Sequence, residues 1–300
     1  MLRYLVALVS AATMASAEAE YLGSYTWERS EDRHGGYSGL EVFDGGTRFV
    51  AIADNGQLVQ GRIERDGDAI TGMRIPYIGG LHTPEGKFVG TIPKRGEVIG
   101  QDSEGLARTP QGSIYVSFES DHRVWFYAEP EGPAAPLPLH HDFSGLKLNV
   151  GLEGLAIDTD GTLFALPETT PAQGEDFPVY RYRAGVGWDQ PFTLRRDGAF
   201  LITGADIGPD GRLYVLERLL RLPFGFASRV RVFTITETGL VDEETLLRSR
   251  TREHDNLEGI AVWRDETGAI RLTMISDDNY NPLQKTEVVE YRLTKDAAGE

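Results

Sequence analysis

The chain has 300 residues, no cysteine and a formal net charge of -16. This negative charge makes nucleic acids and anionic membrane surfaces poor partners, because both are polyanions. Without disulfides the chain depends on a full hydrophobic core, and its length is sufficient for one large domain. We therefore expect a protein with no nucleic-acid partner and no membrane insertion.

Residues 1–17, MLRYLVALVSAATMASA, combine one basic residue with an apolar run and end in small residues. This pattern is typical of a secretory signal peptide and is too short for a membrane anchor. We expect cleavage near Ala17 and a single mature domain over residues 18–300. The predicted location is periplasmic or secreted.

Five segments repeat one pattern, in which a glycine with apolar neighbours leads into a polar turn and then into a run of alternating apolar residues. The pattern predicts β-hairpins, and turns such as DTDGT place Asp-Gly where a tight strand reversal needs a positive φ. The five glycines are spaced by 66, 49, 50 and 55 residues. They are Gly39, Gly105, Gly154, Gly204 and Gly259.

A third and a fourth strand usually follow each hairpin, with no convincing amphipathic helix between them. Four strands about every fifty residues indicate an all-β fold of β-propeller blades. A β-sandwich is the alternative, but sandwiches do not repeat one hairpin at a fixed interval. Residues 20–27 are expected to supply the strand that closes the ring. Five blades are countable, and residues 66–100 leave room for a sixth.

Acidic residues recur at two positions of the repeat. Glu104, Glu153 and Glu258 stand immediately before the glycine of the first strand, where the other two units have Ser38 and Thr203. The second strand ends on acids in every unit, namely Asp54, Glu119, Glu168, Glu217 and the pair Asp277 and Asp278. Since antiparallel neighbours reverse direction, we expect both sets at one mouth of the central channel.

Three glutamates within about 5 Å of one another repel by about 3 kcal/mol per pair at an effective dielectric near 20. Protonation, a neighbouring arginine or a divalent cation would offset this repulsion. Carboxylate oxygens without cysteine or clustered histidine favour Ca²⁺ over zinc or copper. We predict a Ca²⁺ site whose ligands come from Glu104, Glu153, Glu258, Asp54, Glu217, Asp277 and Asp278. Glu119 and Glu168 are interpreted as rim charges.

Cations near the predicted mouth are candidates for binding a small anionic or ester substrate. These are Arg218 and Lys285, with Asn279 beside them and His254 as a candidate general base. Arg218 is also open to interpretation as a structural partner of the acids. His140, His141 and Asp142 are a further metal-binding candidate, in a Pro-rich connection that we expect to be exposed.

Two catalytic motifs fail in this sequence. The run Gly36-Tyr37-Ser38-Gly39-Leu40 lacks the final glycine of a serine-hydrolase nucleophile elbow. The run Arg33-His34-Gly35 does not continue as a histidine phosphatase motif. Of the hydrolytic mechanisms considered, metal-assisted hydrolysis remains.

The ordered motifs DSEGLARTPQGSIYVSFE, VGLEGLAIDTDGTLFALPE, GPDGRLYVLER and ISDDNYNPLQKTEVVEYRL resemble the phytase-like family of exported bacterial proteins. The resemblance extends from Tyr37 to Leu293 and implies a propeller, export and hydrolysis of phosphate or carboxylic esters aided by calcium. Two other functions stay open. One is a non-catalytic ligand-binding propeller with a structural metal, and the other is a lactonase of the gluconolactonase type.

Overall fold

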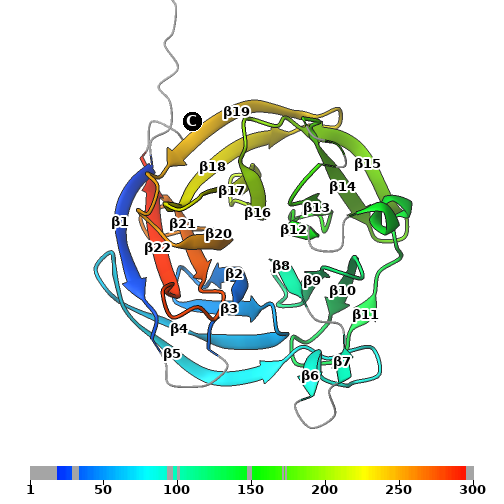
Figure 1. Cartoon of the computed structure of the whole chain (residues 1–300), viewed down its shortest axis with the longest axis horizontal. Helices are drawn as coiled ribbons and strands as arrows, with labels where there is room; N and C mark the ends of the chain where they lie inside the picture. Colours follow the sequence, from blue (N-terminus) through cyan, green and yellow to red (C-terminus); the bar gives the residue numbers. More distant parts are fainter. Residues whose placement is uncertain are drawn as a thin grey trace, which may run out of the picture.

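The computed structural model describes residues 19–28, 34–92, 97–99, 102–146, 151–170, 172 and 174–294. Over these residues the chain forms five four-stranded antiparallel sheets that stand as blades around a central channel (Figure 1). The predicted propeller is confirmed, and the number of blades is five. The predicted signal peptide lies outside the described residues. No helix in the described part of the chain has the length and apolar character needed to cross a bilayer.

The first four blades each use four strands in sequence order, with the first strand at the channel. Blade 1 consists of β2 (Tyr37–Phe43), β3 (Arg48–Ala53), β4 (Gln57–Asp66) and β5 (Ala69–Gly80). Blade 2 consists of β8 (Ser103–Arg108), β9 (Ile114–Phe118), β10 (Arg123–Tyr127) and β11 (Ala135–Pro136). Blade 3 consists of β12 (Leu152–Ile157), β13 (Leu163–Pro167), β14 (Phe177–Arg183) and β15 (Gly187–Leu194). Blade 4 consists of β16 (Leu201–Ile207), β17 (Leu213–Arg221), β18 (Gly225–Ile235) and β19 (Leu240–Arg248).

Blade 5 joins the two ends of the described chain. Its strands are β20 (Asn256–Arg264), β21 (Ile270–Asp277), β22 (Glu287–Leu293) and β1 (Ala19–Thr26). The first strand of the chain pairs antiparallel with β22, which places Ala19 opposite Leu293 and Thr26 opposite Glu287. The predicted closing strand is confirmed, and it covers an edge of β22 that would otherwise be unpaired.

The long first interval of the repeat does not hold a sixth blade. It is taken up by the 10-residue β4, the 12-residue β5 and a two-stranded hairpin of β6 (Gly90–Ile92) and β7 (Glu97–Ile99). A single 3₁₀ turn, η1 (His141–Gly145), follows the outermost strand of blade 2.

The hydrophobic core is divided among the five interfaces between neighbouring blades. Between blades 4 and 5, for example, Tyr214 and Val230 of blade 4 pack with Ile260 and Met274 of blade 5. Each fully buried aliphatic or aromatic side chain contributes roughly 1.5–3 kcal/mol. The interfaces therefore fix the blades rigidly, and with them the side chains at the channel.

Every inner strand carries a β-bulge beside the glycine of the repeat. The pairing with the second strand shifts register there in all five blades. The glycine is required by the close approach of the next inner strand, since a Cβ on Gly204 would lie 2.3 Å from the carbonyl oxygen of Glu258. Bulges re-aim the side chains beside them. The residues concerned are Ser38, Glu104, Glu153, Thr203 and Glu258.

Candidate metal and substrate site at the channel mouth

The strand pairing defines which residues are equivalent at the end of the second strand of each blade. In blade 2 the amide of Glu119 donates to Asp102, and in blade 3 the amide of Glu168 donates to Gly151. In blade 4 the corresponding pairing joins Leu201 to Arg218. The equivalent set is therefore Asp54, Glu119, Glu168, Arg218 and Asp277.

Glu217 is one residue out of this register, and the predicted grouping must be corrected there. Its carboxylate accepts hydrogen bonds from Arg229 at 2.7 and 3.0 Å and from Arg231 at 2.8 and 2.7 Å. Since strand side chains alternate between faces, a shift of one residue moves a side chain to the other face. Glu217 is thus withdrawn into a buried ion-pair network, and Arg218 takes the place predicted for it.

Glu104, Glu119 and Glu153 form the closest acidic cluster at the mouth. One carboxylate oxygen of each lies within 4.8 Å of the others. Glu153 is buried, while Glu104 and Glu119 are partly buried. The amide of Gly151 donates to Glu119 at 2.8 Å and orients it. Two of the three glutamates predicted to converge belong to this cluster, and Glu119, which was interpreted as a rim charge, supplies the third.

Burial and mutual repulsion both disfavour the ionised form of two glutamates in this cluster. Burial, followed by the charges of Glu258 and Glu119, raises the pKa of Glu104 well above its usual range. Burial and then the charges of Glu104 and Glu119 do the same to the pKa of Glu153. A donor set made only of carboxylate oxygens fits a hard cation such as Ca²⁺. The residues present therefore fit the ion that was predicted from the sequence.

Glu258 lies within electrostatic reach of the cluster but is held by a different partner. Arg218 donates to Glu258 and, at 2.8 Å each, to Asn256 Oδ1 and Glu168 Oε1. Asn256 Nδ2 also donates to Glu258 at 2.8 Å. Burial works against the charge of Arg218, but Glu258 and Glu168 outweigh it and raise the pKa of the guanidinium. Arg218 thus bridges blades 3 and 5 across the mouth.

The aspartates of blades 1 and 5 face the same mouth. Burial and then the charge of Glu258 raise the pKa of Asp277 to about 8, and burial raises that of Asp54 to about 6. Asp278 instead ties the loop after β21 to the segment before β2, because it accepts from the amide of Gly36 at 3.1 Å. Asn279 is exposed, and its amide donates to Asp277 at 2.7 Å.

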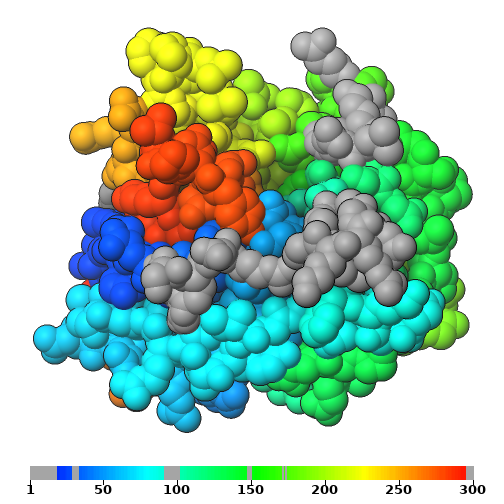
Figure 2. All heavy atoms as spheres, turned by 60° about the horizontal axis from the view of Figure 1, so that its bottom comes forward, coloured from blue at the N-terminus to red at the C-terminus, as the bar shows by residue number. Residues whose placement is uncertain are grey.

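His254 and Lys285 lie together in a separate pocket of about 430 Å³ beside the mouth. His254 Nε2 lies 2.7 Å from the hydroxyl of Tyr291, and Lys285 Nζ lies 2.5 Å from Glu287 Oε2. The sequence analysis expected both residues near the mouth. One wall of the pocket is the tip of the β17–β18 hairpin, which projects in yellow beside the orange and red segments of blade 5 (Figure 2).

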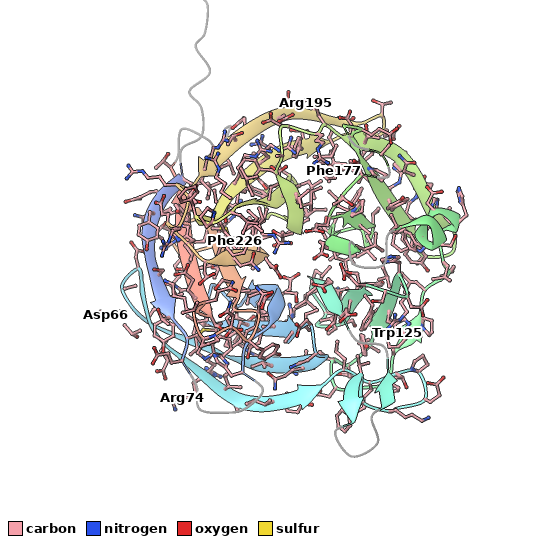
Figure 3. All side chains as sticks on the ribbon, viewed as in Figure 1. Asp66, Arg74, Trp125, Phe177, Arg195 and Phe226 are labelled. Carbon is pink, nitrogen blue, oxygen red and sulfur yellow. The ribbon has the colours of Figure 1, made fainter. Side chains whose placement is uncertain are left out.

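Phe226 connects this pocket to the acids of the mouth. Its ring lines the pocket and lies 5.9 Å from the guanidinium carbon of Arg218. Figure 3 shows Phe226 in the inner part of the ring, whereas Arg195, Asp66 and Arg74 lie at the circumference. The mouth and the pocket are therefore neighbouring parts of one surface.

Several solved structures share the fold at low sequence identity. The catalytic domain of a GH62 α-L-arabinofuranosidase from Coprinopsis cinerea is 14% identical, with a TM-score of 0.53 over 95% of this chain and 99% of that one. A protein whose assignment as a gluconolactonase is itself provisional is 13% identical, with a TM-score of 0.51 over 93% of each chain. The calcium-binding protein regucalcin from Agrobacterium tumefaciens is 11% identical, with a TM-score of 0.49 over 93% and 95%. At these identities the likeness of the first two structures shows the fold alone.

The sequence comparisons are more specific. No curated protein matches the chain significantly. The model of the Phytase-like family, described as esterase-like activity of phytase, matches residues 32–280, which is most of the chain. The chain therefore belongs to the Phytase-like family.

Proposed function

We propose that this protein hydrolyses small phosphate or carboxylic esters at the channel mouth, with Ca²⁺ held by Glu104, Glu119 and Glu153. The observation that carries the proposal is the approach of their three carboxylate oxygens to within 4.8 Å, in a setting where burial raises the pKa of Glu104 and Glu153. Membership of the Phytase-like family supports ester hydrolysis as the reaction class.

When bound, Ca²⁺ supplies a Lewis acid for a phosphoryl or carbonyl oxygen. The chain's own residues set the conditions for binding. Arg218 offsets part of the negative charge of Glu168 and Glu258, which lessens the repulsion that an anionic ester meets at the mouth. Glu119 is oriented by the amide of Gly151, so its oxygen stays directed at the other two glutamates. An anionic substrate should therefore depend on the cation more strongly than a neutral one.

The pocket beside the mouth supports the substrate assignment. Its lining combines the rings of Phe224 and Phe226 with the cations Arg252 and Lys285, and it also includes the acids Glu253 and Asp255. Such a surface fits an ester that combines a negative charge with an apolar group. Its position beside Arg218 places the rest of such a substrate next to the acids.

The test combines metal analysis with a substrate panel on tag-free protein that begins at Glu18. The panel holds phosphate esters, carboxylic esters and lactones. Wild-type protein should contain stoichiometric Ca²⁺ and hydrolyse a phosphate or carboxylic ester, and a chelator should abolish turnover. Glu153→Gln should lose both the metal and the turnover. Glu237→Gln, at an exposed position in the turn between β18 and β19, serves as the matched control. Full turnover in chelator would refute the role of Ca²⁺.

A second function, a ligand-binding propeller with a structural metal, is favoured by the bridging of Glu168 and Glu258 by Arg218. That bridge compensates part of the negative charge at the mouth and connects blades 3 and 5, so it stabilises a rigid binding surface. This function predicts that a chelator lowers the melting temperature while the whole panel stays unhydrolysed. Turnover of lactones alone would instead indicate a lactonase of the gluconolactonase type.

A further inference from the structure

The geometry points to a second metal site, of different chemistry, at the outer rim of the propeller. We propose that His140, His141 and Asp142 bind one divalent transition cation of the Zn²⁺ class. These residues begin η1, which follows the outermost strand of blade 2, so the site is separate from the channel mouth. The proposal does not depend on the proposed hydrolase activity.

The donor atoms of the three side chains lie close together. One donor atom of each lies within 4.8 Å of the others. His141 Nε2 lies 3.0 Å from Asp142 Oδ1, and His140 Nδ1 lies 3.7 Å from Asp142 Oδ2. Tetrahedral zinc binds such ligands at about 2.0–2.2 Å, which places neighbouring donors roughly 3.4 Å apart. The two separations lie on either side of that value but involve different oxygens of Asp142. His140 Nδ1 also accepts from the amide of Asp142 at 3.3 Å, so an ion at this nitrogen would displace that hydrogen bond.

Packing fixes one of the ligands and leaves another free to adjust. His140 is buried, with its ring centre 5.0 Å from that of Tyr180 and 5.7 Å from that of Phe143. The side chain of His141 is 85% exposed. A rigid first ligand lowers the entropic cost of binding, and a mobile second ligand closes on the ion.

The cluster lines a cavity of about 620 Å³ that also presents Trp188, Asp189 and Gln190. Asp189 accepts hydrogen bonds from Arg181 at 3.0 and 2.6 Å and is thereby held in place. Three protein ligands beside an open cavity leave a fourth coordination position for water or a small ligand.

The donor types separate this site from the mouth. Two imidazole nitrogens and one carboxylate suit Zn²⁺, Co²⁺, Ni²⁺ or Cu²⁺, whereas carboxylates alone suit Ca²⁺. The two sites should therefore take up different ions from a mixture. Zn²⁺ should bind at the rim in the presence of excess Ca²⁺.

The test uses Zn²⁺ titrated calorimetrically into tag-free protein in buffer containing Ca²⁺. One equivalent should bind, with a dissociation constant in the micromolar range or below. His141→Ala should weaken binding on the order of 100-fold, since even the loss of an outer partner of a metal ligand costs about 10–100-fold. Because His141 is exposed, this variant should melt at the same temperature as the wild type without metal. Asp142→Asn is the second variant, and Glu153→Gln, at the mouth, is the matched control.

Trp188 provides an independent optical readout because it lines the same cavity. Cu²⁺ should quench part of the tryptophan emission, and Trp188→Phe should remove that part. Equal Zn²⁺ affinity in His141→Ala and wild type would overturn the proposal. So would loss of the Zn²⁺ site in Glu153→Gln, or the same Cu²⁺ quenching in Trp188→Phe as in wild type.

Discussion

Glu217 and Arg218 are consecutive residues of β17, yet their side chains belong to two separate charge networks. Arg218 bridges Glu168 and Glu258 at the channel mouth. Glu217 is fully buried between Arg229 and Arg231. Because successive side chains of a strand point to opposite faces, substitutions at these two positions should have different consequences.

Replacing Arg218 should make the free energy of unfolding depend more strongly on Ca²⁺ than it does in the wild type. Arg218→Met keeps most of the apolar stem but leaves Glu168 and Glu258 without their cation. In chelator we expect a loss of roughly 3 kcal/mol in the free energy of unfolding, because breaking one side of a buried ion pair costs about 3–5 kcal/mol and Arg218 is 21% exposed. The stabilisation added by Ca²⁺ should exceed that of the wild type. Urea denaturation with and without Ca²⁺ measures both quantities, and Arg221→Met, at an exposed position, is the control. Identical losses in both buffers would contradict this coupling.

Replacing Glu217 should reduce stability without changing metal binding. Glu217→Gln leaves two buried guanidinium groups without their shared carboxylate, which should cost about 3–5 kcal/mol. The loss should be the same in Ca²⁺ and in chelator, and the bound Ca²⁺ measured at low temperature should be unchanged. A folded variant that contained no Ca²⁺ would contradict this prediction and would indicate that Glu217 is a metal ligand.

The pH dependence of stability should report Asp277. Burial and the charge of Glu258 raise its pKa from 3.8 to about 8, so the folded protein binds more protons than the unfolded chain between these values. Stability without metal therefore falls as the pH rises through this window, by at most about 1.4 kcal/mol per pH unit. Asp277→Asn lacks this titrating group. Its free energy of unfolding should therefore increase relative to that of the wild type as the pH rises.

The measurement is urea denaturation of both proteins in chelator at intervals between about pH 5 and pH 8, a range that lies between the ordinary and the raised pKa. Comparison of the two proteins cancels the contributions of titrating groups that do not interact with Asp277. A free-energy difference that stays constant across the window would show that Asp277 is ionised throughout in the folded protein.

The repeat glycines should be intolerant of a methyl group. Gly204→Ala would place Cβ 2.3 Å from the backbone oxygen of Glu258, which forces blades 4 and 5 apart. We expect a destabilisation of about 1–3 kcal/mol, the usual cost of overpacking, together with weaker Ca²⁺ binding. Gly239→Ala, where no atom lies within 4 Å of the added Cβ, is the matched control. Thermal melts and metal analysis test the pair, and equal melting temperatures would rule out the steric explanation.

The sequence by itself determined the architecture. The spacing of Gly39, Gly105, Gly154, Gly204 and Gly259, together with the alternating strands, predicts a propeller because each hairpin can bury its faces only against its neighbours. The closing strand near the N-terminus was also predictable, since blade 5 otherwise ends one strand short. The Phytase-like family was recognisable from the ordered motifs, and the family model confirms it.

Only the tertiary structure decided which acids come together. Aligning LFALPE with LYVLER by their acidic residues sets Glu217 beside Glu168, whereas the strand pairing sets Arg218 there. A shift of one residue is invisible in composition but reverses the face of the strand. The meeting of Glu119 with Glu104 and Glu153 likewise depends on the packing of blade 2 against blade 3. The geometry of the ring brings carboxylate oxygens of these three residues, which come from different strands and loops of the two blades, within 4.8 Å of one another.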